Sequence, residues 1–284
     1  MGGRGYQVSR RCRCKSGRVR SLTRCDESLC HRYLDSETEL DRSFSFLYPI
    51  PQDPLTYYPE IISNSLLIPD LIQLLSHENT DIALQVVSAL YEMTDEDVGD
   101  DAVEREEEEE AKEEVGRKLR LIMGDFVGAL VSSKRGGVWR DTSEVVDGKR
   151  NDVACVSQLD QSILELLVAN LARLNEADEE SDRTGVFNIL GIFDNLLSFL
   201  PPLANQVIEQ TDLLTWLLRR ITVPVYDSNK QYASEVLAVL LQEERSVRLK
   251  LDGLGGIEPL LQAVAVSLAV KSTLTERAVW LTAV

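Results

Sequence analysis

The stretch LLSHENTDIALQVVSALYEMTDEDV, residues 74–98, decides the fold of this chain. It holds the end of one apolar helix, a polar turn, a second apolar helix and the acidic residues that follow this helix. In IPDLIQLL (68–75), apolar residues recur at the i, i+3, i+4 and i+7 positions of a one-faced helix. After the turn, Asn79 or Thr80 is a suitable N-cap, with Asp81 favourable in the first turn. The next apolar stripe is Ile82, Val86, Ala89, Leu90 and Met93. The sequence therefore predicts a hairpin of two helices joined by a short polar turn.

The same unit recurs along the chain. The segments that repeat it are 163–176 with 184–202, 211–221 with 229–244, and 255–270, which opens a further unit. Paired leucines in the last three units lie roughly 40–50 residues apart, close to the period of the two- and three-helix armadillo and HEAT repeats. Such units bury their apolar faces by stacking on their neighbours. We therefore predict an all-α fold, an armadillo/HEAT-like α-solenoid of helical repeats.

Composition and charge limit the function. Hydrophobic residues make up 44% of the 284 residues and aromatic residues only 6%, which favours helix-on-helix packing. The net charge of −17 argues against direct binding of nucleic acid and favours basic protein partners. Residues 1–33 differ from the rest, because they carry nine Lys/Arg against two acids. The sequence contains no apolar run long enough for a membrane span and no apolar core of a secretory signal.

These contrasts divide the chain into four predicted regions. Residues 1–46 form a basic, disordered N-terminal segment, and residues 47–93 form a first armadillo-like repeat region. Within the latter, the four prolines of 47–59 are expected to keep that stretch extended or turned. Residues 94–152 form an acidic linker and an insertion, because 94–114 has thirteen acids and two bases and is expected to be solvated and mobile. Residues 153–284 form a truncated array of armadillo-like repeats.

The N-terminal segment leaves several interpretations open. Its arginines are consistent with a nuclear import signal, a basic arm or an organelle transit peptide. The segment also holds four of the five cysteines, Cys12, Cys14, Cys25 and Cys30. Their C-x-C spacing departs from the usual zinc-ligand pairs, so free cysteines are favoured over a zinc site. With only Cys155 elsewhere, the chain is not a disulfide scaffold and is expected in a reducing compartment.

An enzyme is not expected. The chain has two histidines, His31 and His77, and the latter sits in the polar turn, where an exposed position is expected. No Gly-rich phosphate loop, HExxH or GxSxG motif is present. We expect no catalytic residue, no metal and no cofactor.

A binding function is better supported. The acidic run 94–114 is either a solvated linker or an acidic edge that attracts basic peptides to a binding groove. We expect that groove along helices 186–196, 213–220 and 230–241. An Asn on an inner helix can fix an extended peptide backbone, and a Trp face can hold a Lys or Arg stem. The alternative is that the Trp packs against the core and the asparagines act as caps. The candidate contact residues are Asn188, Asp194, Asn195, Trp216, Asn229 and Glu235.

Several blocks resemble the β-catenin-like protein 1 family, an armadillo-type family of the nucleus. Besides 74–98, they are LLVANLARLNE (166–176), GVFNILGIFDNLLSFLP (185–201), the strongest block at 213–242, and LDGLGGIEPLLQAVAV (251–266), all in the family's order. The resemblance is lost in residues 1–36 and after about Lys271, and 115–152 follows it less cleanly. The family's further C-terminal repeats are missing, so an exposed apolar face at 257–270 and self-association are expected.

The resemblance implies a non-catalytic scaffold that associates with the spliceosome through the nineteen complex. It implies partners that are splicing factors with basic nuclear-localisation-type segments, such as the Myb-like cell-division-cycle protein of that complex. The alternative is a nuclear-import or general adaptor solenoid like karyopherin α, which relies on repeated Trp-x-x-x-Asn pairs. Here the fourth residue after Trp216 is Arg220 and the fourth after Trp139 is Ser143, so the repeated Trp-x-x-x-Asn pairs are absent. A truncated product without function would share the fold.

Overall fold

The computed structural model describes residues 27–64, 66–105, 108–133, 161–243 and 245–262. The chain divides into two compact units, residues 1–39 and 40–284. In the first unit the described residues belong to helix α1, which runs from Glu27 to Phe44. All further elements belong to the second unit.

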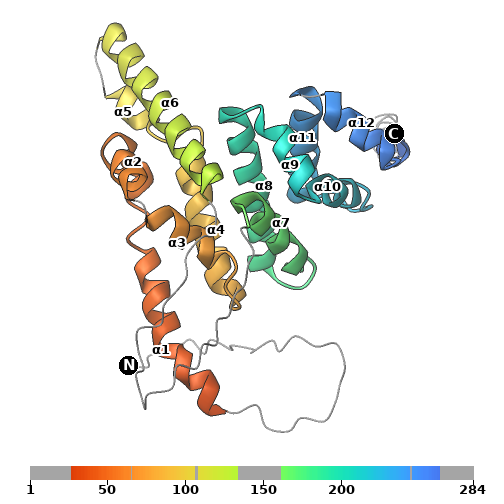
Figure 1. Cartoon of the computed structure of the whole chain (residues 1–284), viewed down its shortest axis with the longest axis horizontal. Coiled ribbons are helices and arrows are strands. Elements are labelled where there is room, and N and C mark those ends of the chain that lie inside the picture. Colours follow the sequence, from red (N-terminus) through yellow and green to blue (C-terminus); the bar gives the residue numbers. More distant parts are fainter. Residues whose placement is uncertain (1–26, 65, 106–107, 134–160, 244, 263–284) are drawn as a thin grey trace, which may run out of the picture. The chain divides into compact units, whose positions relative to one another are not determined.

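Within the described ranges the chain is helical and contains no strand, as the sequence predicts. The elements of the second unit after α1 are η1 (Ile50–Gln52), α2 (Pro54–Ser63), α3 (Leu67–Leu74), α4 (Thr80–Thr94), α5 (Asp100–Glu104), α6 (Glu109–Ser132), α7 (Ile163–Arg173), α8 (Glu180–Phe199), α9 (Leu203–Gln210), α10 (Leu213–Ile221), α11 (Ser228–Glu243) and α12 (Arg245–Gly253). Figure 1 labels the α-helices along the chain.

The hairpin predicted at 68–93 is helices α3 and α4. Asn79 is the N-cap of α4, and its side-chain oxygen accepts the backbone N–H of Asp81 at 3.1 Å. His77 lies in the turn, partly exposed, and its Nδ1 accepts the backbone N–H of Asn79 at 3.0 Å. Every residue of both predicted apolar stripes is buried: Ile68, Leu71, Ile72, Leu75, Ile82, Val86, Ala89, Leu90 and Met93. The helical periodicity therefore identified the buried face correctly.

The later repeats contain a short helix that periodicity did not reveal. Helices α7 and α8 form a second hairpin, and α9, α10 and α11 form a three-helix unit. Helix α9 occupies the interval after Pro201 and Pro202, where the sequence predicts only the end of α8. α7 begins with a capping box, in which the Ser162 and Glu165 side chains each accept the other residue's backbone N–H. The three-helix unit is the architecture of an armadillo repeat.

Helix α8 packs between α4 and α11, and the three helices run in the same direction. On one side, Gly185 lies against Leu84, and further along the Asn195 side chain contacts Thr94. On the other side, the Asn229 side chain donates to the carbonyl of Arg183, and Tyr232 stacks on Phe187. Because residue numbers increase together in each pair, both pairings are parallel. Figure 1 shows α8 beside α4.

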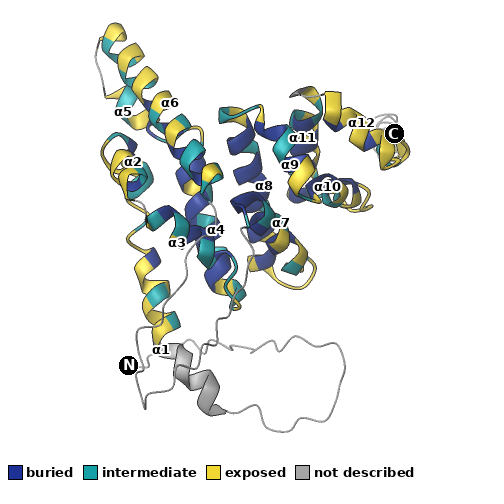
Figure 2. Cartoon of the chain, in the orientation of Figure 1, coloured by how far each residue is buried: buried dark blue, intermediate teal, exposed yellow. Residues whose placement is uncertain are grey.

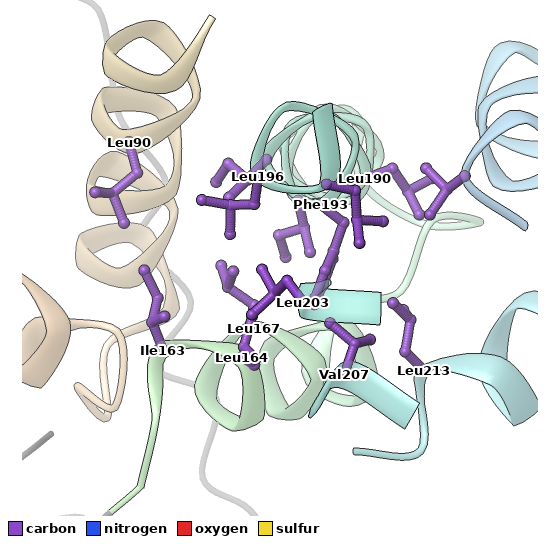
Figure 3. Close-up of a cluster of buried hydrophobic side chains, with 14 of the residues drawn as sticks. Leu90, Ile163, Leu164, Leu167, Leu190, Phe193, Leu196, Leu203, Val207 and Leu213 are labelled. Atoms are coloured by element: carbon purple, nitrogen blue, oxygen red, sulfur yellow. The ribbon is translucent and has the colours of Figure 1, made fainter. Parts of the chain in front are cut away.

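The core lies where these helices meet the shorter ones. Figure 3 shows side chains of α7, α8 and α9 converging, with Leu90 of α4 at one edge and Leu213 of α10 at the other. Phe193, Ile163 and Leu167 in this cluster have no exposed surface. Figure 2 shows the buried residues running along α4, α7 and α8. The repeats thus share one apolar core.

The structure differs from three local predictions. The proline-rich stretch 47–59, expected to be extended or turned, is partly helical, since α2 begins at Pro54 and contains Pro59. Pro54 fits because the first helical position needs no N–H partner. In the acidic run, Asp100–Glu104 is helical, and Glu109–Glu114 forms the first turns of α6, where carboxylates are favourable to the helix dipole. Residues 27–44 of the segment expected to be disordered form α1.

Several predictions fall on residues outside the described ranges. They fall on the first twenty-six residues, on the insertion at 134–152 and on residues 263–284, the end of the predicted array. Among the leucines of the last repeat, Leu260 packs partly against the core, whereas Leu261 is 60% exposed.

Candidate peptide-binding surface

Three aromatic side chains form a row across α4, α8 and α11. The ring centroids of Tyr91 and Phe187 are 6.3 Å apart with an interplanar angle of 74°, and those of Phe187 and Tyr232 are 4.9 Å apart at 54°. All three side chains are partly exposed. We call Tyr91, Phe187 and Tyr232 the aromatic row.

Gly191 makes this arrangement possible. A Cβ atom at this position of α8 would overlap the ring of Tyr91 and would lie 3.0 Å from the hydroxyl oxygen of Tyr232. The absence of a side chain therefore lets tyrosines from both neighbouring helices approach the backbone of α8. Substitution at Gly191 would displace Tyr91 from the row.

Carboxylates follow the aromatic row on each of the three helices. Asp95 comes directly after α4, Asp194 is in α8 and Glu235 is in α11. Asp95 and Asp194 are partly exposed and Glu235 is exposed. We call these three residues the acidic row.

The carboxylates Asp194 and Glu235 are close enough to interact, and Asp95 is close enough to act on the tyrosines. Burial raises the pKa of Asp194 above its usual value, and the charges of Glu96 and Glu235 raise it further. The pKa of Tyr232 is raised well above its usual value by burial and then by the charge of Asp194. Burial, followed by the charge of Asp95, likewise raises the pKa of Tyr91. Each shift disfavours additional negative charge, so a cation at this surface is favoured.

The acidic surface continues into a pocket beside η1, α4 and α5. This pocket has a volume of about 420 Å³. Its lining includes Tyr48 and the carboxylates Glu92, Asp95, Asp97 and Asp101. Asp95 therefore belongs both to the pocket and to the acidic row.

The six contact residues predicted from the sequence lie in different environments in the structure. Asp194 and Glu235 lie on adjacent helices, and the charge of Glu235 contributes to the raised pKa of Asp194. Asn195 is 8% exposed, and its Nδ2 donates to Thr94 Oγ1 at 3.5 Å, which ties α8 to α4. Asn188 is also buried. Trp216 lies on α10, not on one of the three parallel helices, and packs partly buried against the core.

Asn229 belongs to a polar network at the start of α11. Its Nδ2 donates to Glu176 Oε2 at 2.8 Å and to the Arg183 carbonyl at 2.9 Å. Arg220, at the end of α10, donates to both oxygens of Glu176 at 2.9 Å and to Asp227 Oδ1 at 2.6 Å. We call Arg220, Glu176, Asp227 and Asn229 the Arg220 network. Asn229 is 1% exposed, so it serves the fold in this structure.

The previous repeat boundary has a similar contact. Arg173, at the end of α7, donates from Nη2 to the carbonyls of His77 and Glu78 at 3.0 and 3.1 Å. Asn170 in the same helix donates to the Leu75 carbonyl at 2.8 Å. In both cases, an arginine near the end of one helix holds the turn between the helices of the preceding unit.

Sequence reasoning missed the aromatic row and Gly191. A sequence signal for it exists, since α4, α8 and α11 each carry an aromatic residue that is followed three or four residues later by Asp95, Gly191 or Glu235. Among the described residues, no group of His, Cys, Asp and Glu is arranged to hold a metal ion. A search of the same residues finds no helix long and apolar enough to cross a membrane.

The stacked helical units, with their three-helix repeat and shared core, define an armadillo-type α-solenoid. The family model described as "Catenin-beta-like, Arm-motif containing nuclear" matches residues 27–269, and the chain belongs to this family. Human β-catenin-like protein 1 is 32% identical over 237 residues, which are 83% of this chain and 33% of the human protein. The Schizosaccharomyces pombe β-catenin-like protein 1 homolog is 30% identical over 241 residues, 82% of this chain and 33% of that protein. The chain thus spans about a third of the length of these curated relatives, and the family resemblance seen in the sequence is confirmed.

Proposed function

We propose that this chain is a non-catalytic, nuclear protein-binding scaffold in pre-mRNA splicing. It binds basic nuclear-localisation-type segments of splicing factors on the surface formed by α4, α8 and α11, and it associates with the spliceosome through the nineteen complex. The family supports the nuclear location, because its description includes the word nuclear. The single observation that carries the binding proposal is the aromatic row beside the acidic row on three successive parallel helices.

The chemistry of the surface matches a basic peptide on two counts. Its carboxylates attract Lys and Arg side chains, and the overall charge of −17 raises the rate of encounter with a basic partner. Its partly exposed rings offer cation–π contacts, each with an energy of about 0.5–1 kcal/mol at an exposed site. Binding should therefore weaken as salt rises, because salt screens the charge attraction.

The test is a pull-down from nuclear extract with the full chain, at low and at high salt, followed by mass spectrometry. We expect splicing factors that carry Lys/Arg-rich segments, with recovery lost at high salt. The double variant D194N/E235Q should lose these partners. A charge-matched control is E209Q/D212N, which removes two exposed carboxylates at α9 and α10. Equal recovery by the two double variants, or the absence of splicing factors from the wild-type sample, would contradict the proposal.

A further inference from the structure

The aromatic row and the acidic row are separated by about one helical turn on α4 and α11 and by about two turns on α8. On α11, Glu235 follows Tyr232 by three residues, and Asp95 follows Tyr91 by four. Three to four residues are one helical turn, which advances about 5.4 Å along the axis. On α4 and α11 the rings and the carboxylates therefore form two adjacent levels, whereas on α8 Asp194 follows Phe187 by seven residues.

On α8 the space between the two levels is covered by side chains of the neighbouring helices. The residue one turn after Phe187 is Gly191, and the next turn carries Asp194. Because Gly191 has no side chain, the ring of Tyr91 and the hydroxyl of Tyr232 pack over the backbone of α8, and the path from Phe187 to Asp194 runs over them. A partner's side chain that lies along this path would contact the rings first and a carboxylate at its end.

The carboxylate level has no cation from the chain itself. In the described part of the chain, none of the salt bridges involves Asp194, Glu235 or Asp95. Glu235 accepts one hydrogen bond, from Gln231 Nε2 at 3.0 Å. The basic groups closest in sequence on α8 and α11 point elsewhere, since Arg183 pairs with Glu180 and Lys230 donates to the Val223 carbonyl.

We propose that this surface selects basic side chains by the length of their apolar stem. The methylene groups of a partner's lysine or arginine lie on Phe187 and Tyr232, and the charged head group reaches Asp194 and Glu235. The fit arises at Tyr232 and Glu235, because the stem of such a side chain is about as long as the one helical turn that separates these two residues. A shorter cation reaches either the rings or the carboxylates, but not both. This inference rests on the proposed binding of basic segments and specifies what that surface recognises.

The test uses three fluorescein-labelled synthetic peptides in which basic residues alternate with glycine. The basic residue is lysine in the first, ornithine in the second and 2,4-diaminobutyrate in the third, so charge is constant while the stem loses one methylene at each step. We expect fluorescence anisotropy with the full chain to give about fourfold weaker binding per methylene removed for each seated side chain, which corresponds to about 0.8 kcal/mol per buried CH₂.

The outcomes separate this inference from the function on which it rests. Equal affinity for the three peptides, lost at high salt, would overturn the stem-length inference and leave the acidic surface as a binder of charge alone. No salt-sensitive binding of any of the three peptides would contradict the proposed function itself. The variant Y232A should bind the lysine and ornithine peptides more equally, whereas D194N should weaken the binding of all three. The peptide series on the wild-type chain decides the question even if Y232A unfolds.

Discussion

Replacing Arg220 by methionine should destabilise the junction between two repeats without touching the aromatic or acidic row. The Arg220 side chain is 10% exposed, and its partners Glu176 and Asp227 are 22% and 37% exposed. The variant R220M keeps much of the apolar stem but removes three charge-assisted hydrogen bonds of 2.6–2.9 Å. Glu176 is then left partly buried without its cation.

The magnitude follows from burial. Removing one partner of a fully buried ion pair costs about 3–5 kcal/mol, because the other charge stays buried and unpaired. The cost is smaller here because Asp227 is more than a third exposed and regains water, and Glu176 keeps the hydrogen bond from Asn229. We therefore expect R220M to lower the free energy of unfolding by about 3 kcal/mol. For a domain of this size, that corresponds to a fall in Tm of about 6–12 °C.

The assay combines thermal melting with hydrogen exchange. Repeat arrays can unfold in parts, so exchange rates of individual helices show where the change acts. R220M should speed exchange in α10 and α11 and leave α3 and α4 almost unchanged. The matched control is R219M, because Arg219 is the exposed neighbour and should change stability by no more than about 0.5 kcal/mol. If both variants melt at the same temperature, the Arg220 network does not stabilise the junction and the reasoning is refuted.

Three further predictions concern pH, capping and the acidic surface. Although burial opposes it, hydrogen bonding by Arg220 holds the pKa of Asp227 below its usual value. The stability from this pair is therefore present above the pKa that Asp227 has in the unfolded state, and it is lost as pH falls through the lower pKa of the folded state. Thermal melts of wild type and R220M should accordingly converge below about pH 4. The variant S162A loses the capping box of α7 and should lower the free energy of unfolding by about 1 kcal/mol in urea titrations; an unchanged midpoint would count against the cap. D194N should raise the Tm at pH 7, because the folded state disfavours the ionised form of Asp194. The same variant should weaken the binding of basic peptides. A fall in both the Tm and the affinity would show that the carboxylate stabilises the fold instead.

The sequence was a good guide to the fold where the helices are long and one-faced. α3, α4, α7 and α10 follow from apolar spacing, and Asn79 follows from the preference of short polar side chains for N-caps. Helix α9 was not predicted, because its eight residues follow two prolines and give too short a pattern to recognise. Helix α2 was not predicted, because proline is usually interpreted as a helix breaker, although Pro54 is well tolerated at the first position of a helix.

The candidate surface was harder to predict, for a different reason. Asp194 and Glu235 were identified because acids suit basic partners, but the contact between Tyr91 and Gly191 joins residues a hundred positions apart and has no local signature. An aromatic residue in an apolar helix is normally read as part of the core. Asn229 shows the converse, since its place at a helix start was consistent with either a peptide contact or a structural role, and the Glu176 side chain determines which it has in this structure.

The positions of the Arg220 network and the two rows suggest how the fold separates stability from recognition. The network contacts α8 and α11 near their first turns, through the Arg183 carbonyl and Asn229. The acidic row occurs later on the same two helices, at Asp194 and Glu235. Because the helices are parallel, the network lies at one level of the array and the carboxylates lie at another, where the contact between Asn195 and Thr94 also joins α8 to α4. Changes in the acidic row can then alter which basic segment binds without weakening the stacking of the repeats, and changes in the network can loosen the stacking while the surface keeps its charge.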